Sequence, residues 1–380
     1  MIFYAYPPCP EKCKGEYSPH IQQLMKTHNI HQSPQVEKLI PNLNDKQKYV
    51  VHYENLKLYL SLGCELGKIH RILSFDQEIF KQYIDFNSAK RAVAKSELER
   101  DMYKLSNNAL FGKTCEDVSK RIDIKFINLE DENKFVICAN KPNYKYHNQV
   151  SEDLMAVNMG LTTIKYNKPI AIGFCVLDIS KTFMYDFHYN TIMKKYGDKA
   201  KLLFTDTDSL CYEIKCEDFY ADMKDDLDKY DLSNYPEDHP LYLAHPDKNK
   251  NKKVPLKFKD EADSYIIREF CGLRSKLYTL IIDHPDKKKQ IKGTCKGVKK
   301  VARQKLTMKN YKAAIFGNTK AELQQTSSFY LIRQHNHDVD TIKITKTSLS
   351  GMDDKRFLLE DGITSYAHGH KAIKKMQSKN

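Results

Sequence analysis

The 380-residue sequence predicts an α+β fold, and three observations lead to this prediction. The run AKLLFTDTDSLCYEI at 200–214 places two apolar half-strands around a polar tip, which is the pattern of a β-hairpin. Apolar residues recur with the period of an α-helix from about Gln77 to Phe111. Three more runs read as strands, and they are KFKDE, IIREFCGL and KLYTLIID, between residues 257 and 283.

The N-terminal third of the chain begins without a sustained periodicity of apolar residues. Residues 1–45 are rich in Pro, Asn, Gln and His, and we expect an irregular segment there. From Tyr49 the pattern VVHYENLKLYLSLG predicts a short strand that leads into a helix stopped by Gly63. The run KIHRILSF at 68–75 predicts a further strand.

The long helical region has an internal boundary near Ser96. Ser96 and Glu99 fit a capping box, in which a hydroxyl and a carboxylate satisfy backbone N–H groups at a helix start. We therefore expect two helices packed as a hairpin, followed by an insertion of charged turns and short β-like runs over 114–165.

The central part of the chain mixes apolar and amphipathic runs. PIAIGFCVL at 169–177 predicts a buried strand, and SKTFMYDFHYNTIMKKYG predicts a helix closed by Gly197. EDFYADMKDDLDKY at 217–230 predicts a helix lying across the sheet, with one apolar face made by Phe219, Met223, Leu227 and Tyr230. From Gly293 basic helices and then mixed strands follow, so we expect a domain boundary there.

Charge and composition narrow the class of protein. Lys and Arg outnumber Asp and Glu by 62 to 49, and the formal charge of +13 suits a large anionic partner, although a merely soluble basic protein has the same signature. The longest apolar stretch, 170–179, is shorter than the roughly 20 residues of a membrane span, so no membrane partner is expected. The cysteines are scattered singly and predict reduced thiols in an intracellular compartment, with nucleus, mitochondrion and virus-associated sites all open.

The sharpest chemical feature is FTDTDSL at 204–210. Asp206 and Asp208 alternate across a threonine, and in an extended chain such residues share one face about 7 Å apart. Both carboxylates are then able to converge on one hard cation, held by the rigidity of the flanking strands. A bare D-x-D is more often an ordinary turn, because Asp stabilises turns through its own backbone.

The second feature is KLSNNALFG at 104–112. Lys104, Asn108 and Phe111 lie at i, i+4 and i+7, so a helix displays them as one stripe about 10 Å long. An ammonium, an amide and a ring in a row suit the triphosphate, sugar and base of a nucleotide. We expect the opposite face to pack inward, and it consists of Leu98, Met102, Leu105 and Ala109. An amphipathic helix with a glycine stop gives the same stripe without any ligand.

The third feature is RSKLY at 274–278, where Lys276 and Tyr278 are expected on one face of a strand. Such a pair is suited to hold a phosphate and brace the sugar or base beside it.

The order of these features resembles family B DNA polymerases, whose motif B, motif C and K-x-Y series match K-x-x-x-N-x-x-F-G, D-T-D-S and K-x-Y here. Phe111 stands where motif B more usually has Tyr. Several stretches are similar to the protein-primed branch of viruses, linear plasmids and Polinton-type elements: HYENLKLYLSLG, YIDFN, FGKT, MYDFHY, YGDKAKLLFTDTDS, EDFY, DHPLY, GLRSKLY and EDGIT.

The resemblance implies roles for these residues. Asp208 is the principal ligand of both catalytic metals and Asp206 its essential neighbour. Lys104, Asn108 and Phe111 bind the nucleotide, with phosphate contacts from the basic residues Lys90, Arg91 and Lys95. Lys276 and Tyr278 hold the primer terminus.

It also implies a partial right-hand polymerase fold. The expected parts are a remnant of palm and connecting segment at 1–85, fingers helices with motif B at 86–113, an insertion linked to strand displacement and processivity at 114–165, a palm with motif C and K-x-Y at 166–290, and a thumb at 291–380.

The implied reaction is attack of a primer hydroxyl on the α-phosphate of a deoxynucleoside triphosphate, assisted by two Mg²⁺ ions about 3.5 to 4 Å apart. The expected partners are a DNA primer-template, deoxynucleoside triphosphates and a terminal priming protein. DNA binding should be sequence-blind and salt-sensitive.

One part of the pattern is missing. The second metal-binding carboxylate of this family comes from motif A, a D-x-x-S-L-Y-P-like strand, and the nearest string, YAYPP at 4–8, has no Asp before it. We therefore expect an incomplete metal site, a chain that lacks motif A and the exonuclease domain, and little polymerisation by the chain alone. Two alternatives remain: a non-catalytic nucleic-acid-binding remnant of a viral or mobile-element polymerase, and a metal nuclease that uses Asp206 and Asp208.

Overall fold

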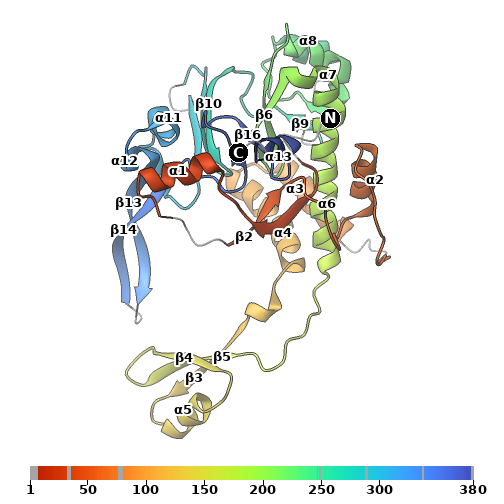
Figure 1. Ribbon diagram of the computed structural model, residues 1–380. Coiled ribbons are helices and arrows are strands. Elements are labelled where there is room, and N and C mark those ends of the chain that lie inside the picture. The colour runs from red at the N-terminus through yellow and green to blue at the C-terminus, as the bar shows by residue number, and fades with distance from the viewer. Residues whose placement is uncertain are drawn as a thin grey trace. The chain divides into compact units, whose positions relative to one another are not determined.

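The structure is a computed structural model that describes residues 7–31, 36–75, 80–245, 247, 250–252, 254–286, 290–335 and 338–377. The chain divides into two compact units. Unit 1 comprises residues 1–72, 178–329 and 345–380, and unit 2 comprises residues 73–177 and 330–344. Helices and strands are mixed in both, which confirms the α+β class (Figure 1).

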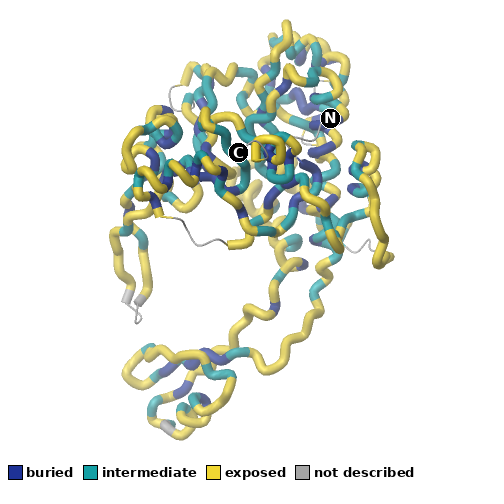
Figure 2. The backbone as a smooth tube through the Cα atoms, viewed as in Figure 1, coloured by how far each residue is buried: buried dark blue, intermediate teal, exposed yellow. Residues whose placement is uncertain are grey.

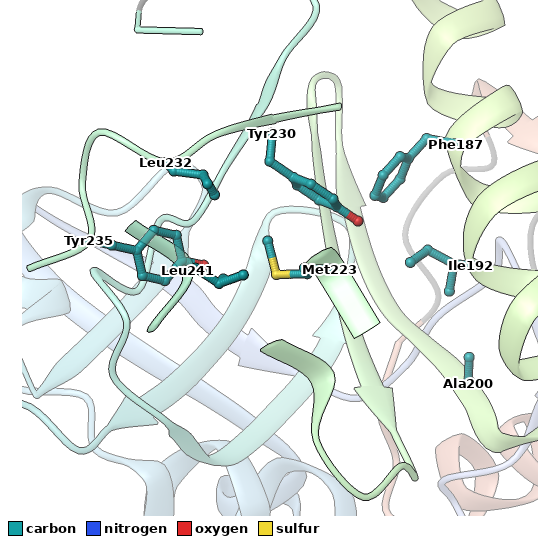
Figure 3. Close-up of a cluster of buried hydrophobic side chains, with 8 residues drawn as sticks. All are labelled: Phe187, Ile192, Ala200, Met223, Tyr230, Leu232, Tyr235 and Leu241. Atoms are coloured by element: carbon teal, nitrogen blue, oxygen red, sulfur yellow. The ribbon is translucent and has the colours of Figure 1, made fainter. Parts of the chain in front are cut away.

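The predicted central hairpin is present in unit 1. Strands β6 (Ala200–Asp206) and β7 (Ser209–Ile214) pair antiparallel. A core of buried side chains lies against the hairpin, and Figure 3 shows these side chains pointing toward one another: Phe187, Ile192, Ala200, Met223, Tyr230, Leu232, Tyr235 and Leu241. The β7 residues Leu210, Tyr212 and Ile214 pack on this core, so one side of the hairpin is anchored by apolar burial.

The segment after the hairpin forms the predicted apolar face without the predicted single helix. It contains α8 (Phe219–Met223), the 3₁₀ helix η4 (Lys224–Lys229) and β8 (Tyr230–Asp231). Asp226 has φ −131° and interrupts the helix. A run rich in Asp favours such breaks, because its carboxylates compete for backbone N–H groups.

A three-stranded antiparallel sheet follows, in the order β10-β11-β12. Its strands are β10 (Ile267–Arg274), β11 (Leu277–Ile282) and β12 (Ile291–Cys295). Helix α11 (Met308–Phe316) covers one side (Figure 1) and buries Tyr311 and Ala314 among the apolar residues of β10 and β11. Strands were predicted for both 266–273 and 276–283, and both are confirmed.

The remaining elements of this part of the chain are short, apart from one long hairpin. They are α7 (Lys194–Tyr196), η3 (Gly197–Lys199), α9 (Pro240–Ala244), β9 (Phe258–Lys259), α10 (Lys300–Arg303), α12 (Lys320–Leu323) and the paired strands β13 (Gln324–His335) and β14 (Asp338–Ser350). β9 pairs in parallel with β8.

The N-terminal segment is more ordered than its composition predicted. It forms β1 (Pro10–Lys14), α1 (Pro19–Thr27) and β2 (Glu37–Pro41), and β1 pairs with β2. The prediction of an irregular 1–45 is therefore wrong for these described stretches. Strand pairing between separated segments has no local signal, but Ser18 followed by Pro19 is a helix start that we overlooked.

Long-range contacts within unit 1 bind this segment to the end of the chain. Lys38 forms an ion pair with Asp354, whose side chain is buried. The backbone N–H of Leu43 donates to the carbonyl of His368 at 2.8 Å. The C-terminal elements are β15 (Phe357–Leu358), β16 (Ser365–Tyr366) and α13 (Lys371–Gln377).

Helix α2 (Tyr53–Ser61) is confirmed, but neither strand predicted around it is present. The described residues 49–52 and 68–75 have no strand partner. Alternation of apolar and polar residues alone does not supply a neighbouring strand edge, and neither run forms regular secondary structure.

In unit 2, helices α3 (Lys81–Val93) and α4 (Glu97–Thr114) form the predicted helical hairpin. The predicted start at Gln77 lies outside the described residues. Ser96 is the N-cap of α4, and its hydroxyl accepts from the N–H of Glu99. The Glu99 carboxylate returns to the N–H of Lys95 rather than to Ser96.

The face of α4 that we expected to be buried is exposed. Leu98, Met102 and Leu105 are 72%, 59% and 66% exposed, so the prediction that this stripe packs inward is wrong. A part-buried amide pair joins the helices instead, with the buried Asn87 donating from Nδ2 to Asn107 Oδ1 at 2.9 Å.

The expected insertion is a small sheet with its own core. Strands β3 (Ile122–Asn128), β4 (Tyr144–Gln149) and β5 (Leu154–Gly160) pair in the order β3-β5-β4. Before β3 lies the 3₁₀ helix η1 (Val118–Lys120), and α5 (Glu132–Ala139) packs against the sheet. Buried residues gather along β5 and beside α5 (Figure 2).

Helix α6 (Ile170–Asp186) replaces the strand predicted for 169–177. A short apolar run is ambiguous between strand and helix by period alone. Val176 and Leu177 are 51% and 44% exposed, so the run is not a buried strand. The helix continues into the π-helix η2 (Phe187–Met193), in agreement with the helix predicted for 180–197. Among the described residues, no helix combines the length and apolarity needed to cross a bilayer.

Candidate active site

The tip of the β6–β7 hairpin carries both carboxylates of the D-T-D-S run. Asp206 ends β6 opposite Ser209, and Thr207 and Asp208 form the turn between them. The N–H of Asp208 donates to the carbonyl of Asp206 at 2.6 Å, and Thr207 has φ +56°. The sequence predicted that the two aspartates share one face of an extended strand. This prediction is wrong, because the chain reverses between them.

Thr207 is an unfavourable residue for this turn. A β-branched residue at positive φ is a genuine outlier, and such backbone strain costs about 1 to 3 kcal/mol. The two paired strands hold the residue there. The turn leaves Asp208 exposed and Asp206 half-buried, so both carboxylates remain accessible beside a rigid support.

A second hairpin in the same unit brings a cation to this tip. Ser275 and Lys276 form the turn between β10 and β11, and Lys276 has φ +58°. Lys276 Nζ lies 3.0 Å from Asp206 Oδ1, with the two side chains 51% and 31% exposed. Lys276 is thus in the turn, and the prediction that it shares a strand face with Tyr278 is wrong in geometry.

Three aromatic rings join the two hairpins. The ring of Phe204 on β6 stacks on Tyr278 of β11, with centroids 4.1 Å apart and planes at 21°. Phe270 of β10 stacks on Phe204 at 5.7 Å. Burial raises the pKa of Tyr278, and the negative charge of Asp206 raises it further. The phenol of Tyr278 therefore stays protonated and able to donate a hydrogen bond.

Phe204 and Phe270 were not among the site residues predicted from the sequence. One signal was available for Phe204, which stands two residues before Asp206 on a predicted strand and so belongs to the same side of that strand. Phe270 depends on a contact between separate sheets, which no local pattern reveals.

His188 contacts the hairpin through Tyr212 of β7. It lies in η2, is 1% exposed, and its Nδ1 is 2.9 Å from the hydroxyl of Tyr212 on β7. The two rings also stack, with centroids 5.8 Å apart. Burial lowers the pKa of His188 to about 4, so the ring is neutral at neutral pH and Nδ1 is able to accept a hydrogen bond from the Tyr212 hydroxyl.

The donor chemistry of the tip fits a hard divalent cation. Carboxylate oxygens are the ligands that Mg²⁺ prefers, and proteins commonly hold Mg²⁺ by one or two carboxylates together with substrate phosphates. Asp206 already binds a cationic group, the Lys276 ammonium. Within the described ranges, no group of three or more His, Cys, Asp or Glu side chains is arranged to hold a metal ion.

The motif B stripe lies on α4 in unit 2. Lys104 and Asn108 are exposed, and Phe111 is half-buried. A Cβ atom added to Gly173 of α6 would come within 3.6 Å of the Phe111 ring, so the ring lies against that helix. Lys90 and Arg91 are exposed in the last turn of α3, and Lys90 Nζ lies 5.7 Å from the centroid of the Phe86 ring.

The structure thus brings the predicted residues together in two groups. Asp206, Asp208, Lys276 and Tyr278 meet in unit 1, and Lys104, Asn108 and Phe111 share one helix in unit 2.

Comparison with known families identifies the chain. Residues 2–196 match the family described as DNA polymerase type B, organellar and viral. The chain belongs to this family of type B DNA polymerases, which gives it a DNA polymerase-related function. The match includes the motif B stripe and ends before Asp206. No curated protein matches the chain, and no solved structure matches it.

Proposed function

We propose that this chain is a DNA-directed DNA polymerase of the protein-primed branch, with a right-hand polymerase fold. The observation that carries the proposal is the Lys276–Asp206 ion pair, which joins motif C to the K-x-Y turn from a hairpin some seventy residues further along the chain. Family membership supports it independently, because the match covers the motif B helix.

Asp208 and Asp206 would hold Mg²⁺ at the hairpin tip. The metal, when bound, neutralises charge on the triphosphate and lowers the pKa of the attacking hydroxyl. Lys104 contacts the triphosphate, Phe111 walls off the base and sugar, and Asn108 supports both. The exposed Lys90 and Arg91 add phosphate contacts.

The K-x-Y residues position the primer end. The Lys276 ammonium is held beside Asp206, where it is able to bind a backbone phosphate of the primer. Tyr278 stacks on Phe204 and keeps its proton, so its hydroxyl is oriented to donate to the primer terminus. Template pairing selects the nucleotide, and the protein's own contacts to DNA are sequence-blind.

The test is template-directed incorporation of a single nucleotide on a primer-template in Mg²⁺ buffer. We expect motif A to be missing, because the sequence holds no D-x-x-S-L-Y-P string. The assay therefore has one arm with the chain alone and one with an added polypeptide that carries such a strand from a type B polymerase. We expect incorporation in the second arm. Asp208→Asn should reduce it by about 100-fold or more, the scale of losing one group that stabilises a transition state.

Matched controls separate the roles. Asp198→Asn removes an exposed carboxylate just before β6 and should leave incorporation unchanged. Phe111→Tyr should keep the KM for the nucleotide, whereas Phe111→Ala should raise it. Lys276→Met should weaken primer binding more than Lys201→Met, which removes a lysine of β6 whose Nζ lies 4.0 Å from Glu213.

The competing function is a non-catalytic DNA-binding remnant. DNA binding whose affinity falls with salt, with no incorporation in either arm, would establish the remnant and overturn the polymerase proposal. Initiation on a terminal protein rather than on a nucleic-acid primer end would support the protein-primed branch.

A further inference from the structure

Two cysteines from separate segments of unit 1 meet beside α2. Cys9 precedes β1, and Cys64 follows Leu62, the C-cap of α2. The Cys9 thiol is hydrogen-bonded to the Cys64 sulfur. Both side chains are half-buried, and both are free thiols.

Backbone contacts fix each cysteine in place. The hydroxyl of Tyr49 donates to the carbonyl of Pro10 at 3.0 Å, next to Cys9. The N–H of Cys64 donates to the carbonyl of Tyr59 at 3.0 Å, which closes the end of α2. Both side chains pack against one buried cluster, which consists of Leu58, Tyr59, Tyr185 and Tyr189. The two thiols therefore lie at the edge of a packed hydrophobic core, which holds the two segments together.

The surroundings make the two thiols unequal. The hydrogen bond from Cys9, with help from the Lys46 ammonium, lowers the pKa of Cys64. The same hydrogen bond and burial raise the pKa of Cys9, with a smaller contribution from Asp178. Lys46 is held close by, with its side chain 11% exposed and its Nζ 2.7 Å from the carbonyl of Asn44. A half-buried thiolate beside a cation is the setting of reactive cysteines.

We propose that Cys9 and Cys64 form a dithiol that a small disulfide of the glutathione class converts reversibly to an intramolecular disulfide. The Cys64 thiolate attacks one sulfur of the small disulfide, forms a mixed disulfide and releases one thiolate. Cys9 loses its proton to solvent, attacks the Cys64 sulfur and displaces the second thiolate. Two protein thiols are oxidised and one small disulfide is reduced to two thiols.

The neighbouring cysteine provides a built-in comparison. Cys13 lies on β1, close to Cys9 in sequence, and is also half-buried. Its sulfur accepts from Asn42 Nδ2 at 3.6 Å, and burial raises its pKa. Cys13 should therefore react more slowly than Cys64 and should not compete for Cys9.

The experiment exposes the full-length protein to glutathione buffers of increasing disulfide fraction at pH 7.5. Thiols are trapped by acid and N-ethylmaleimide, and linked peptides are identified by mass spectrometry. We expect the Cys9–Cys64 peptide to appear before any other pair and to disappear with dithiothreitol. Cys9→Ser should stop the reaction at a glutathione adduct on Cys64, and Cys64→Ser should leave Cys9 unmodified.

Cys13→Ser is the matched control and should give the same linked peptide as the parent protein. The wild-type measurement needs no variant, so a misfolded variant does not decide the outcome. A stable glutathione adduct on Cys64 in the wild-type chain, or a Cys9–Cys13 link formed first, would overturn the proposal.

Discussion

Acidification should destabilise the protein through His188, the buried histidine behind the central hairpin. Burial lowers its pKa from 6.5 to about 4 in the folded state. Above about pH 7 the ring is neutral in both folded and unfolded chains, and its contribution to stability is complete. Between pH 6.5 and 4 the unfolded chain takes up a proton that the folded chain does not, so the free energy of unfolding falls as the pH falls.

The size of the effect follows from the shift. A difference of 2.5 pKa units corresponds to about 3 kcal/mol, reached below pH 4. Between pH 7.5 and 5.5 the same relation gives a loss of about 1 kcal/mol. Other groups also titrate in this range, so the measured quantity is the difference between the wild type and His188→Gln, whose amide is able to accept from Tyr212 but does not titrate.

Urea unfolding at pH 7.5 and 5.5 measures this difference. The wild type should lose about 1 kcal/mol more than His188→Gln over this interval. His70→Gln, which removes an exposed histidine, should retain the wild-type dependence. Parallel pH dependence of the wild type and His188→Gln would refute the assignment of a buried neutral ring.

Three other experiments test the packing around the two groups of site residues. Gly173→Ala should lower stability by about 1 to 3 kcal/mol by urea unfolding, because its Cβ would lie 2.0 Å from Cys115 Sγ, and Cys115→Ala should restore most of the loss. In a double-mutant cycle, Phe204→Leu and Tyr278→Leu should show a coupling of about 0.5 to 1.5 kcal/mol, whereas additive losses would contradict the stack. Thr207→Gly should change stability by less than about 1 kcal/mol, since relief of backbone strain offsets the added freedom of the unfolded chain. The same substitution should weaken Mn²⁺ binding measured by paramagnetic resonance. A large destabilisation would show that the turn is unstrained.

The elements predicted most reliably were those specified by neighbouring residues. The β6–β7 hairpin follows from two apolar runs around a polar tip, and α4 follows from a helical period with a Ser96 cap. The strand predicted for 169–177 failed because a short apolar run fits either structure, and tertiary contacts decide. The β1–β2 pairing was missed because its two partners are separated by a helix.

The site shows the same division between local and non-local information. Residue types and order singled out Asp206, Asp208, Lys276 and Tyr278 as candidates, and their roles stay predictions. The turns that hold them depend on backbone conformations that local sequence does not reveal. Thr207 and Lys276 both adopt positive φ, although neither is a residue that favours it. A propensity argument therefore predicts extended chain at both positions, and tertiary structure overrides it.

The two strained turns are informative together rather than singly. Each lies in a two-residue connection, and the ion pair between Lys276 and Asp206 joins one turn to the other. Strain persists only where surrounding structure over-determines it, and here that structure is a hydrogen-bonded ladder on each side and the Phe204–Tyr278 stack between them. An exposed ion pair contributes little to stability. The Lys276–Asp206 pair is therefore better explained by where it holds its two charges than by the folding free energy it contributes. Two carboxylates and an ammonium fixed at adjoining turns form a preorganised polar surface, and phosphate and metal chemistry require such a surface.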